Sequence, residues 1–178
     1  MSTTTSRHGA ATQTTPVTAS DVGLLPLRVV FGLGLAAHGT QKLFGWFGGG
    51  GIAGTGQGFQ GMGFSPGAPI AAVAGVVEVA GGLALVAGLL TPLACAGIAA
   101  TMFGATAAVW AGSGAYFKAD GGMEYELLLA AAGLALALTG PGRIALDHGR
   151  PWLQDKFRYA AFGLGLALGL LALLVRAV

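Results

Sequence analysis

The sequence predicts an all-α integral membrane protein, built as a bundle of transmembrane helices. Of its 178 residues, 54% are hydrophobic and only 9% are charged, whereas soluble domains carry about 25% charged residues. The charged residues leave long apolar gaps, for example between Lys42 and Glu78 and between Glu78 and Lys118. A membrane-spanning helix needs about 20 mostly apolar residues. We therefore expect a multi-pass protein whose main partner is the lipid bilayer.

Five spans account for the apolar segments. Thr91-Pro92 separates the second span from the third, because proline is unfavourable inside a helix. Gly140-Pro141-Gly142 ends the fourth span as a strong turn signal. The spans are expected at about residues 22–44, 70–90, 93–111, 123–139 and 159–175.

The chain divides into three parts. Residues 1–20 are rich in Ser and Thr and are expected to form a disordered cytoplasmic tail. They lack the apolar segment of a cleavable signal peptide, so the first span should act as an uncleaved anchor. Residues 21–148 form the predicted transmembrane core, and residues 149–178 form a cytoplasmic loop and the fifth, C-terminal transmembrane helix.

Basic residues predict the orientation in the membrane. The connection between the last two spans carries Arg143, Arg150, Lys156 and Arg158, whereas residues 45–69 carry no charge. The positive-inside rule places the basic connection in the cytoplasm. We expect a protein of the cytoplasmic membrane with the N-terminus inside and, with five spans, the C-terminus outside.

Several kinds of function are disfavoured by composition. The net charge of +2 is small and the basic residues are scattered, which argues against nucleic acid as a partner. Cys95 is the single cysteine, so thiol redox chemistry and cysteine-rich metal sites are not expected. Gly56 to Gly61 fit GxGxxG, but no strand precedes them, so they are expected to form a glycine-rich loop. We expect no metal and no intrinsic cofactor.

Ionisable side chains inside the spans are the best candidates for function. They are Arg28, His38 and Lys42 in the first span and Glu78 in the second. A charge at the bilayer centre costs roughly 2.5–3.5 kcal/mol on insertion scales, so it needs a partner or a cavity.

A binding or proton-handling site is predicted in the outer half of the bundle. His38 and Lys42 are four residues apart and share a helix face. His38 and Glu78 should lie at similar depth on neighbouring antiparallel helices, so we expect them to be in contact. Glu124 and Glu126 enter the fourth span from the same side, and Glu126 is included in the site. The alternatives are a purely structural His38–Glu78 pair, a Lys42 that extends to the lipid headgroups, and Glu124 and Glu126 as interfacial loop residues.

A second polar pair is predicted at the cytoplasmic side. Arg28 lies about 15 Å further in than His38 along the same helix. Asp147, after the Gly-Pro-Gly turn, is its expected structural partner, with Asp21 as an alternative. Arg28 could instead serve only as an anchor at the cytoplasmic interface.

Two spans carry small residues at every fourth position, a pattern typical of close helix packing in membranes. These faces either pack within the bundle or join a second copy of the chain as a homo-oligomer. The residues are Ala96, Ala100, Gly104, Ala108 and Gly112 in the third span, and Ala161, Gly165 and Gly169 in the fifth.

At these residues the chain resembles the DoxX family of small membrane proteins. The resemblance rests on Arg28 followed by HGTQK (38–42), on EVAGGLALVAGLLTP (78–92) and on GPGRIALD (140–147). It departs from the family pattern at Ala145, where a serine is frequent, and in the fifth span, beyond the usual four-helix core. The resemblance implies a DoxX-like four-helix core in the cytoplasmic membrane.

The family is named after a subunit of a terminal quinol oxidase, and related chains occur in thiosulfate:quinone oxidoreductases. The resemblance therefore implies a respiratory or sulfur-linked redox context, with quinone as the expected ligand and redox partner subunits as the electron source. It assigns no reaction and no catalytic residue to this chain. The alternatives are a small-solute or proton-coupled transporter and a membrane scaffold for soluble redox enzymes.

Overall fold

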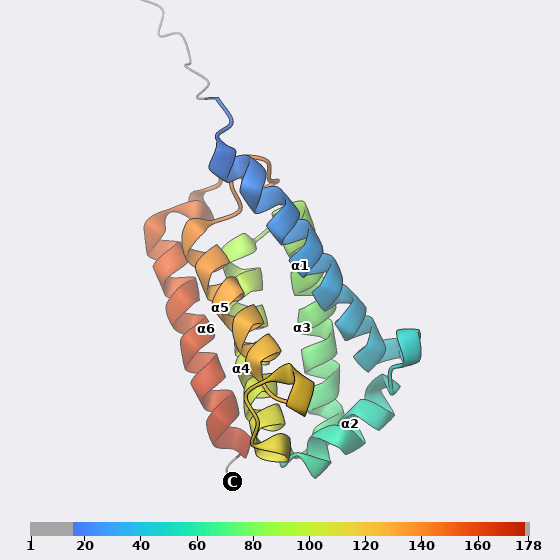
Figure 1. The fold of residues 1–178 in the computed structure, drawn as a ribbon. Helices are drawn as coiled ribbons and strands as arrows, with labels where there is room; N and C mark the ends of the chain where they lie inside the picture. Colours follow the sequence, from blue (N-terminus) through green and yellow to red (C-terminus); the bar gives the residue numbers. More distant parts are fainter. Residues whose placement is uncertain (1–15, 177–178) are drawn as a thin grey trace, which may run out of the picture.

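The computed structural model describes residues 16–176, and within this range all regular secondary structure is helical. The predicted all-α bundle is confirmed, and the long helices lie side by side (Figure 1). Most of the predicted tail, residues 1–15, lies outside the described residues. The long helices are α1 (Ala19–Phe44), α3 (Gly67–Ala87), α4 (Thr91–Ser113), α5 (Glu124–Thr139) and α6 (Asp155–Arg176).

Four of these helices, α1, α3, α4 and α6, are long and apolar enough to cross a membrane. Large apolar side chains cover the outside of the bundle, including Val30 at 73%, Val73 at 64% and Leu128 at 65% exposure. Such a surface suits lipid rather than water. The fourth predicted span, α5, has 16 residues and is about 24 Å long, shorter than a hydrocarbon core of about 30 Å.

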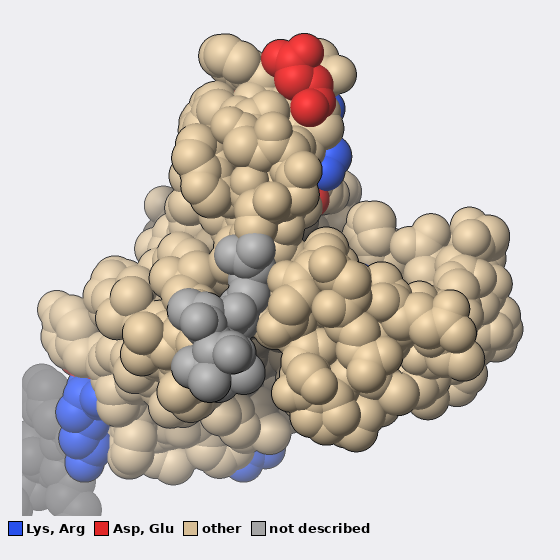
Figure 2. Space-filling model, turned by 90° about the horizontal axis from the view of Figure 1, so that it is seen from below, with Lys and Arg blue, Asp and Glu red and all other residues tan. Residues whose placement is uncertain are grey.

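The long helices alternate in direction, so each end of the bundle gathers distinct segments. One end, here called the basic end, holds the start of α1, the α3–α4 turn and the loop 140–154 (Figure 1). The opposite end, here called the α2 end, holds α2 (Gly51–Gly61) and the C-terminal end of α6. Seen from the α2 end, the surface is mostly uncharged (Figure 2), because residues 43–69 contain no charged side chain.

Glycines bring α1 and α3 into close contact. A Cβ atom at Gly39 would lie 2.6 Å from the Val79 side chain, and one at Gly75 would lie 2.7 Å from Leu43. Gly32 and Gly82 face each other in the same way further along the two helices. The backbones can approach only because these side chains are absent.

The small-residue faces of α4 and α6 pack against each other within the bundle. Ala96 is fully buried, and a Cβ at Gly165 would lie 3.3 Å from the Ala96 Cα. Gly104 of α4 likewise faces Ala172 of α6, and Gly169 faces Phe103. These parts of the two faces therefore pack against each other inside one copy of the chain, whereas a Cβ at Gly112, at the end of the α4 face, would meet no atom within 4 Å; the homo-oligomer stays a prediction.

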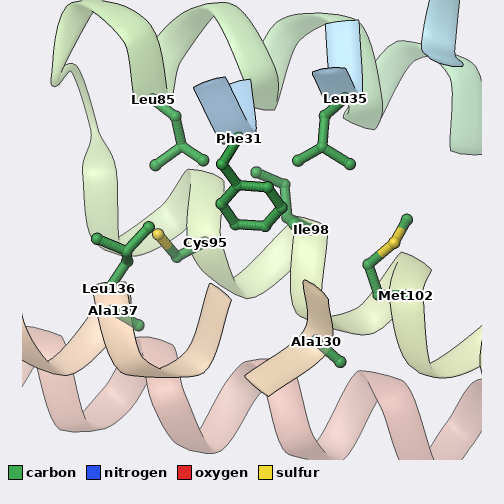
Figure 3. Packing of buried hydrophobic residues seen from close by; sticks show 9 residues of the cluster. All are labelled: Phe31, Leu35, Leu85, Cys95, Ile98, Met102, Ala130, Leu136 and Ala137. Atoms are coloured by element: carbon green, nitrogen blue, oxygen red, sulfur yellow. The ribbon is translucent and has the colours of Figure 1, made fainter. Parts of the chain in front are cut away.

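One core joins α1, α3, α4 and α5. The Phe31 ring lies among Leu35, Leu85 and Ile98 (Figure 3), and Cys95 is buried in the same cluster. Ala130, Leu136 and Ala137 contribute from α5. The helix α5 is thus part of the bundle core although it is short.

The glycine-rich segment after α1 is not a loop, and that prediction is wrong: Gly51–Gly61 forms α2. Glycine costs about 1 kcal/mol relative to alanine in a helix, but here it permits close packing. A Cβ at Gly56 would lie 2.7 Å from the Ala68 backbone at the start of α3. Tertiary contact therefore outweighs the weak helical propensity of this segment.

Candidate functional site

Lys42 and Glu78 form an ion pair between α1 and α3. Lys42 Nζ lies 2.6 Å from Glu78 Oε2. The Glu78 side chain is 2% exposed and the Lys42 side chain is 21% exposed. Glu78 lies near the middle of α3, about 16 Å along the helix from its first residue. The ammonium group therefore gives a deeply buried carboxylate its positive partner in a region of low dielectric constant.

The α1–α3 glycines position this pair. Gly39 precedes Lys42 by one helical turn, and Gly75 precedes Glu78 by one turn, so each charged residue shares a face with a contact glycine. A larger residue at either glycine would separate the helices. The close approach lets a lysine from the last turn of α1 reach the middle of α3.

His38 is not hydrogen-bonded to Glu78, so the predicted contact between them is replaced by the Lys42 contact. His38 Nδ1 instead lies 3.0 Å from Gln41 Oε1 on its own helix, and the His38 side chain is exposed. The longer lysine side chain reaches the carboxylate, while the imidazole remains at the edge of the site.

A cavity of about 480 Å³ brings the four predicted site residues together: His38, Lys42, Glu78 and Glu126 all line it. Most of the remaining wall is apolar, with contributions from α3, α4 and α6, and Tyr125 and Thr101 add hydroxyl groups. Small-molecule sites typically combine an apolar wall with a few convergent polar groups. Tyr125 is not among the site residues expected from the sequence, although its position next to Glu126 could have suggested it.

Glu126 forms a second ion pair on the cavity wall. Its Oε1 atom lies 2.8 Å from Lys118 Nζ, and its side chain is 14% exposed. Its Oε2 atom is buried and has no hydrogen-bond partner among the described residues. Lys118 is not among the site residues expected from the sequence, although it is the only cation between Glu78 and Arg143 in the sequence.

At the basic end, Arg28 is buried within the bundle, with 1% exposure. Its Nη2 atom donates a 2.6 Å hydrogen bond to the Ile144 carbonyl oxygen. Its Nε and Nη1 atoms have no partner among the described residues. Among the described residues, no ion pair joins Arg28 to Asp147. Instead, Arg28 binds the loop 140–150 through the Ile144 carbonyl, and Asp147 anchors the same loop to the start of α4.

Asp147 is fully buried and caps α4 from a distant loop. Its Oδ1 atom accepts from the Leu90 N–H at 2.9 Å and from Trp152 Nε1 at 2.8 Å. Its Oδ2 atom accepts from the Thr91 N–H at 2.8 Å. A carboxylate here satisfies backbone donors that a helix N-terminus leaves unpaired. Its observed contacts are thus those of a structural residue.

Asp21 holds the other side of the same loop. Its Oδ1 atom accepts from the Arg143 N–H at 2.8 Å, and its Oδ2 atom accepts from Thr18 at the N-cap of α1. Asp21 is therefore not the partner of Arg28. The GPGRIALD segment is anchored at one side by α1 and at the other by the α3–α4 turn.

Within the described residues, no group of three or more His, Cys, Asp or Glu side chains is arranged to hold a metal ion. A family model described as DoxX matches residues 23–111, half of the chain, from the start of α1 almost to the end of α4. No curated protein and no solved structure matches the chain.

Proposed function

The chain belongs to the DoxX family of membrane proteins, and we propose that it is a multi-pass subunit that binds a quinone headgroup in the cavity beside Lys42 and Glu78. We place it in the cytoplasmic membrane with the basic end and the N-terminus on the cytoplasmic side, following the positive-inside rule. It serves a respiratory or sulfur-linked oxidoreductase whose other subunits supply or receive electrons.

The observation that carries this proposal is a charged pair inside an apolar cavity. The Lys42–Glu78 pair lies on the wall of a space of about 480 Å³ that is otherwise mostly apolar. Quinones have the matching chemistry, with a flat apolar ring and two carbonyl oxygens. The apolar outside of the bundle suits contact with the bilayer, in which a lipid-soluble ligand would reside.

Lys42 would orient the headgroup. An ammonium group has three N–H donors, and among the described residues one of them is used by Glu78. A quinone carbonyl oxygen can accept another. His38 at the cavity edge adds an imidazole that can donate or accept a further hydrogen bond.

Glu78 would handle protons. Oxidation of a quinol releases two protons and two electrons. Glu78 can accept one proton from a quinol hydroxyl that lies within hydrogen-bond reach, and the imidazole of His38 at the cavity edge can accept the second. The electrons pass to a partner subunit, because the sequence indicates no electron carrier in this chain.

Direct binding tests the proposal. The chain in neutral lipid nanodiscs is titrated with a short-chain ubiquinone, and binding is followed by tryptophan quenching. Glu78→Gln should weaken binding about tenfold, through loss of a charged hydrogen-bond partner. Ala105→Phe, which fills the cavity wall, should abolish binding without removing a charge. Asp120→Asn, which removes a charge at the same end outside the cavity, should bind like the wild type.

The outcomes separate the alternatives. No quinone binding by the folded wild type would remove the proposal. Solute uptake in vesicles that requires Glu78 would favour a transporter. Wild-type behaviour of Glu78→Gln in both assays would favour a scaffold whose charges serve packing.

A further inference from the structure

A second pocket, of about 500 Å³, lies at the basic end, away from the Lys42–Glu78 cavity. Arg143, Arg150 and Arg158 line it together with His148. Among the residues that the structure describes, Asp21 is the one acidic residue on its wall, and its carboxylate already accepts hydrogen bonds from Thr18 and from the Arg143 backbone. Arg150 and Arg158 therefore add positive charge to a pocket wall whose aspartate is already engaged.

Arg158 contributes a guanidinium group that is poorly compensated. Its Nε atom is buried and has no hydrogen-bond partner among the described residues. Its ion pair is with Asp155, at 3.8 Å, and the Asp155 side chain is 83% exposed. An ion pair this long and this solvated contributes little. The guanidinium therefore keeps donor capacity for an anion.

The walls of this pocket are held in place by the loop 140–154. The Arg150 N–H donates to the Asp147 carbonyl at 2.8 Å, and the Leu153 N–H donates to the Arg150 carbonyl at 3.1 Å. The Arg150 guanidinium lies 5.8 Å from the centre of the Trp152 ring. Arginine guanidinium groups suit phosphate oxygens because their donors form a planar fork.

The pocket lies where phospholipid headgroups are expected. Phe157 and Tyr159, at the start of α6, are 44% and 68% exposed, and aromatic side chains of this kind mark the headgroup level. Basic pockets beside transmembrane helices on the cytoplasmic side bind phosphate-bearing headgroups. We propose that the pocket lined by Arg143, Arg150 and Arg158 binds a negatively charged phosphate group, most directly the headgroup of an anionic phospholipid.

The test uses the full chain in neutral detergent, titrated separately with short-chain phosphatidylglycerol, short-chain phosphatidylcholine and inorganic phosphate. Binding is read as a rise in the unfolding temperature. Phosphatidylglycerol should stabilise the wild type. Arg150→Gln and Arg158→Gln should each weaken its affinity roughly fivefold, whereas the matched control Lys156→Gln should change it less than about twofold.

Lys156 is a suitable control because it belongs to the same segment, carries the same charge and does not line the pocket. If Arg158→Gln does not fold, Arg158→Lys is used in its place, because lysine keeps the positive charge but lacks the planar fork of donors. Stabilisation by phosphatidylglycerol alone identifies a lipid headgroup, and stabilisation by inorganic phosphate as well extends the site to free phosphate. The proposal is overturned if the wild type is stabilised by neither, if phosphatidylcholine binds equally well, or if Lys156→Gln weakens binding as much as Arg150→Gln.

Discussion

Lys42 reaches Glu78 from the last turn of α1, whereas Glu78 lies near the middle of α3. The two partners are therefore unequal in their access to the membrane surface. A lysine has a long apolar stem and can extend to the headgroups when its partner is removed. A glutamate that is 1% exposed cannot.

This inequality predicts different costs for the two single substitutions. Lys42→Met leaves Glu78 buried without a cation and should lower the free energy of unfolding by roughly 3–5 kcal/mol. Glu78→Gln should cost clearly less, because Lys42 can turn toward the headgroups. The double variant Lys42→Met/Glu78→Gln should recover much of the loss. Unfolding in mixed micelles of lipid and sodium dodecyl sulfate measures all three. Equal costs for the two single variants would contradict the assigned burial of Glu78.

Gly88 should not tolerate a side chain. Its φ of +65° is unfavourable for other residues, and a Cβ there would collide with Arg28 Nη1 and with Ala145. Gly88→Ala should lower the free energy of unfolding by at least about 2 kcal/mol. Gly34→Ala in α1 is the control, because a Cβ there meets no atom within 4 Å. It should be neutral or stabilising by up to about 1 kcal/mol. Similar stabilities for the two variants would exclude the close Arg28–Gly88 contact.

Asp147 should be required as a carboxylate. Asp147→Asn keeps its size but places an amide N–H₂ group against the N–H donors of Leu90, Thr91 or Trp152. The expected loss in unfolding free energy is roughly 2–3 kcal/mol. Asp155→Asn, at a side chain that is 83% exposed, should change it by less than about 0.5 kcal/mol. Thermal unfolding in the same lipid compares the two, and a tolerant Asp147 would contradict the capping role.

The two ends of the chain should lie on opposite sides of the membrane. Five long helices alternate in direction from α1 to α6 (Figure 1), so an odd number of crossings is expected. Reporters active only in the cytoplasm or only outside it, fused before residue 1 and after residue 178, measure this. Both ends on one side would rule out five crossings.

The helices and their ends follow closely from apolar runs and turn residues. The spans expected at 70–90 and 93–111 correspond to Gly67–Ala87 and Thr91–Ser113, because Gly88 and Pro92 limit where a helix can continue. The short α5 was expected with nearly the same bounds. Its ability to cross the membrane depends on bilayer thickness and packing, which periodicity does not encode.

The contacts within the candidate site were harder to predict. Sequence spacing places His38 and Lys42 on one helix face, but it does not reveal which side chain reaches Glu78. That choice depends on the Gly39–Gly75 approach and on side-chain length. Asp147 was assigned to Arg28 because opposite charges were expected to pair. Backbone N–H groups at the start of α4 compete for the same carboxylate. Every residue except proline has such a group, so residue type does not indicate which of them will bind Asp147.

The Asp147 cap also bears on where this protein can be cut, tagged or extended. The loop 140–150 is bound at both sides, through Asp21 to Arg143 and through Asp147 to the start of α4. An affinity tag or fluorescent domain inserted there would have to break these bonds, so such fusions should misassemble. The connection around Gly112 and Gly114 at the opposite end meets no neighbouring atom within 4 Å at either glycine. An engineer who needs an internal label should therefore place it at that connection and leave the basic end intact.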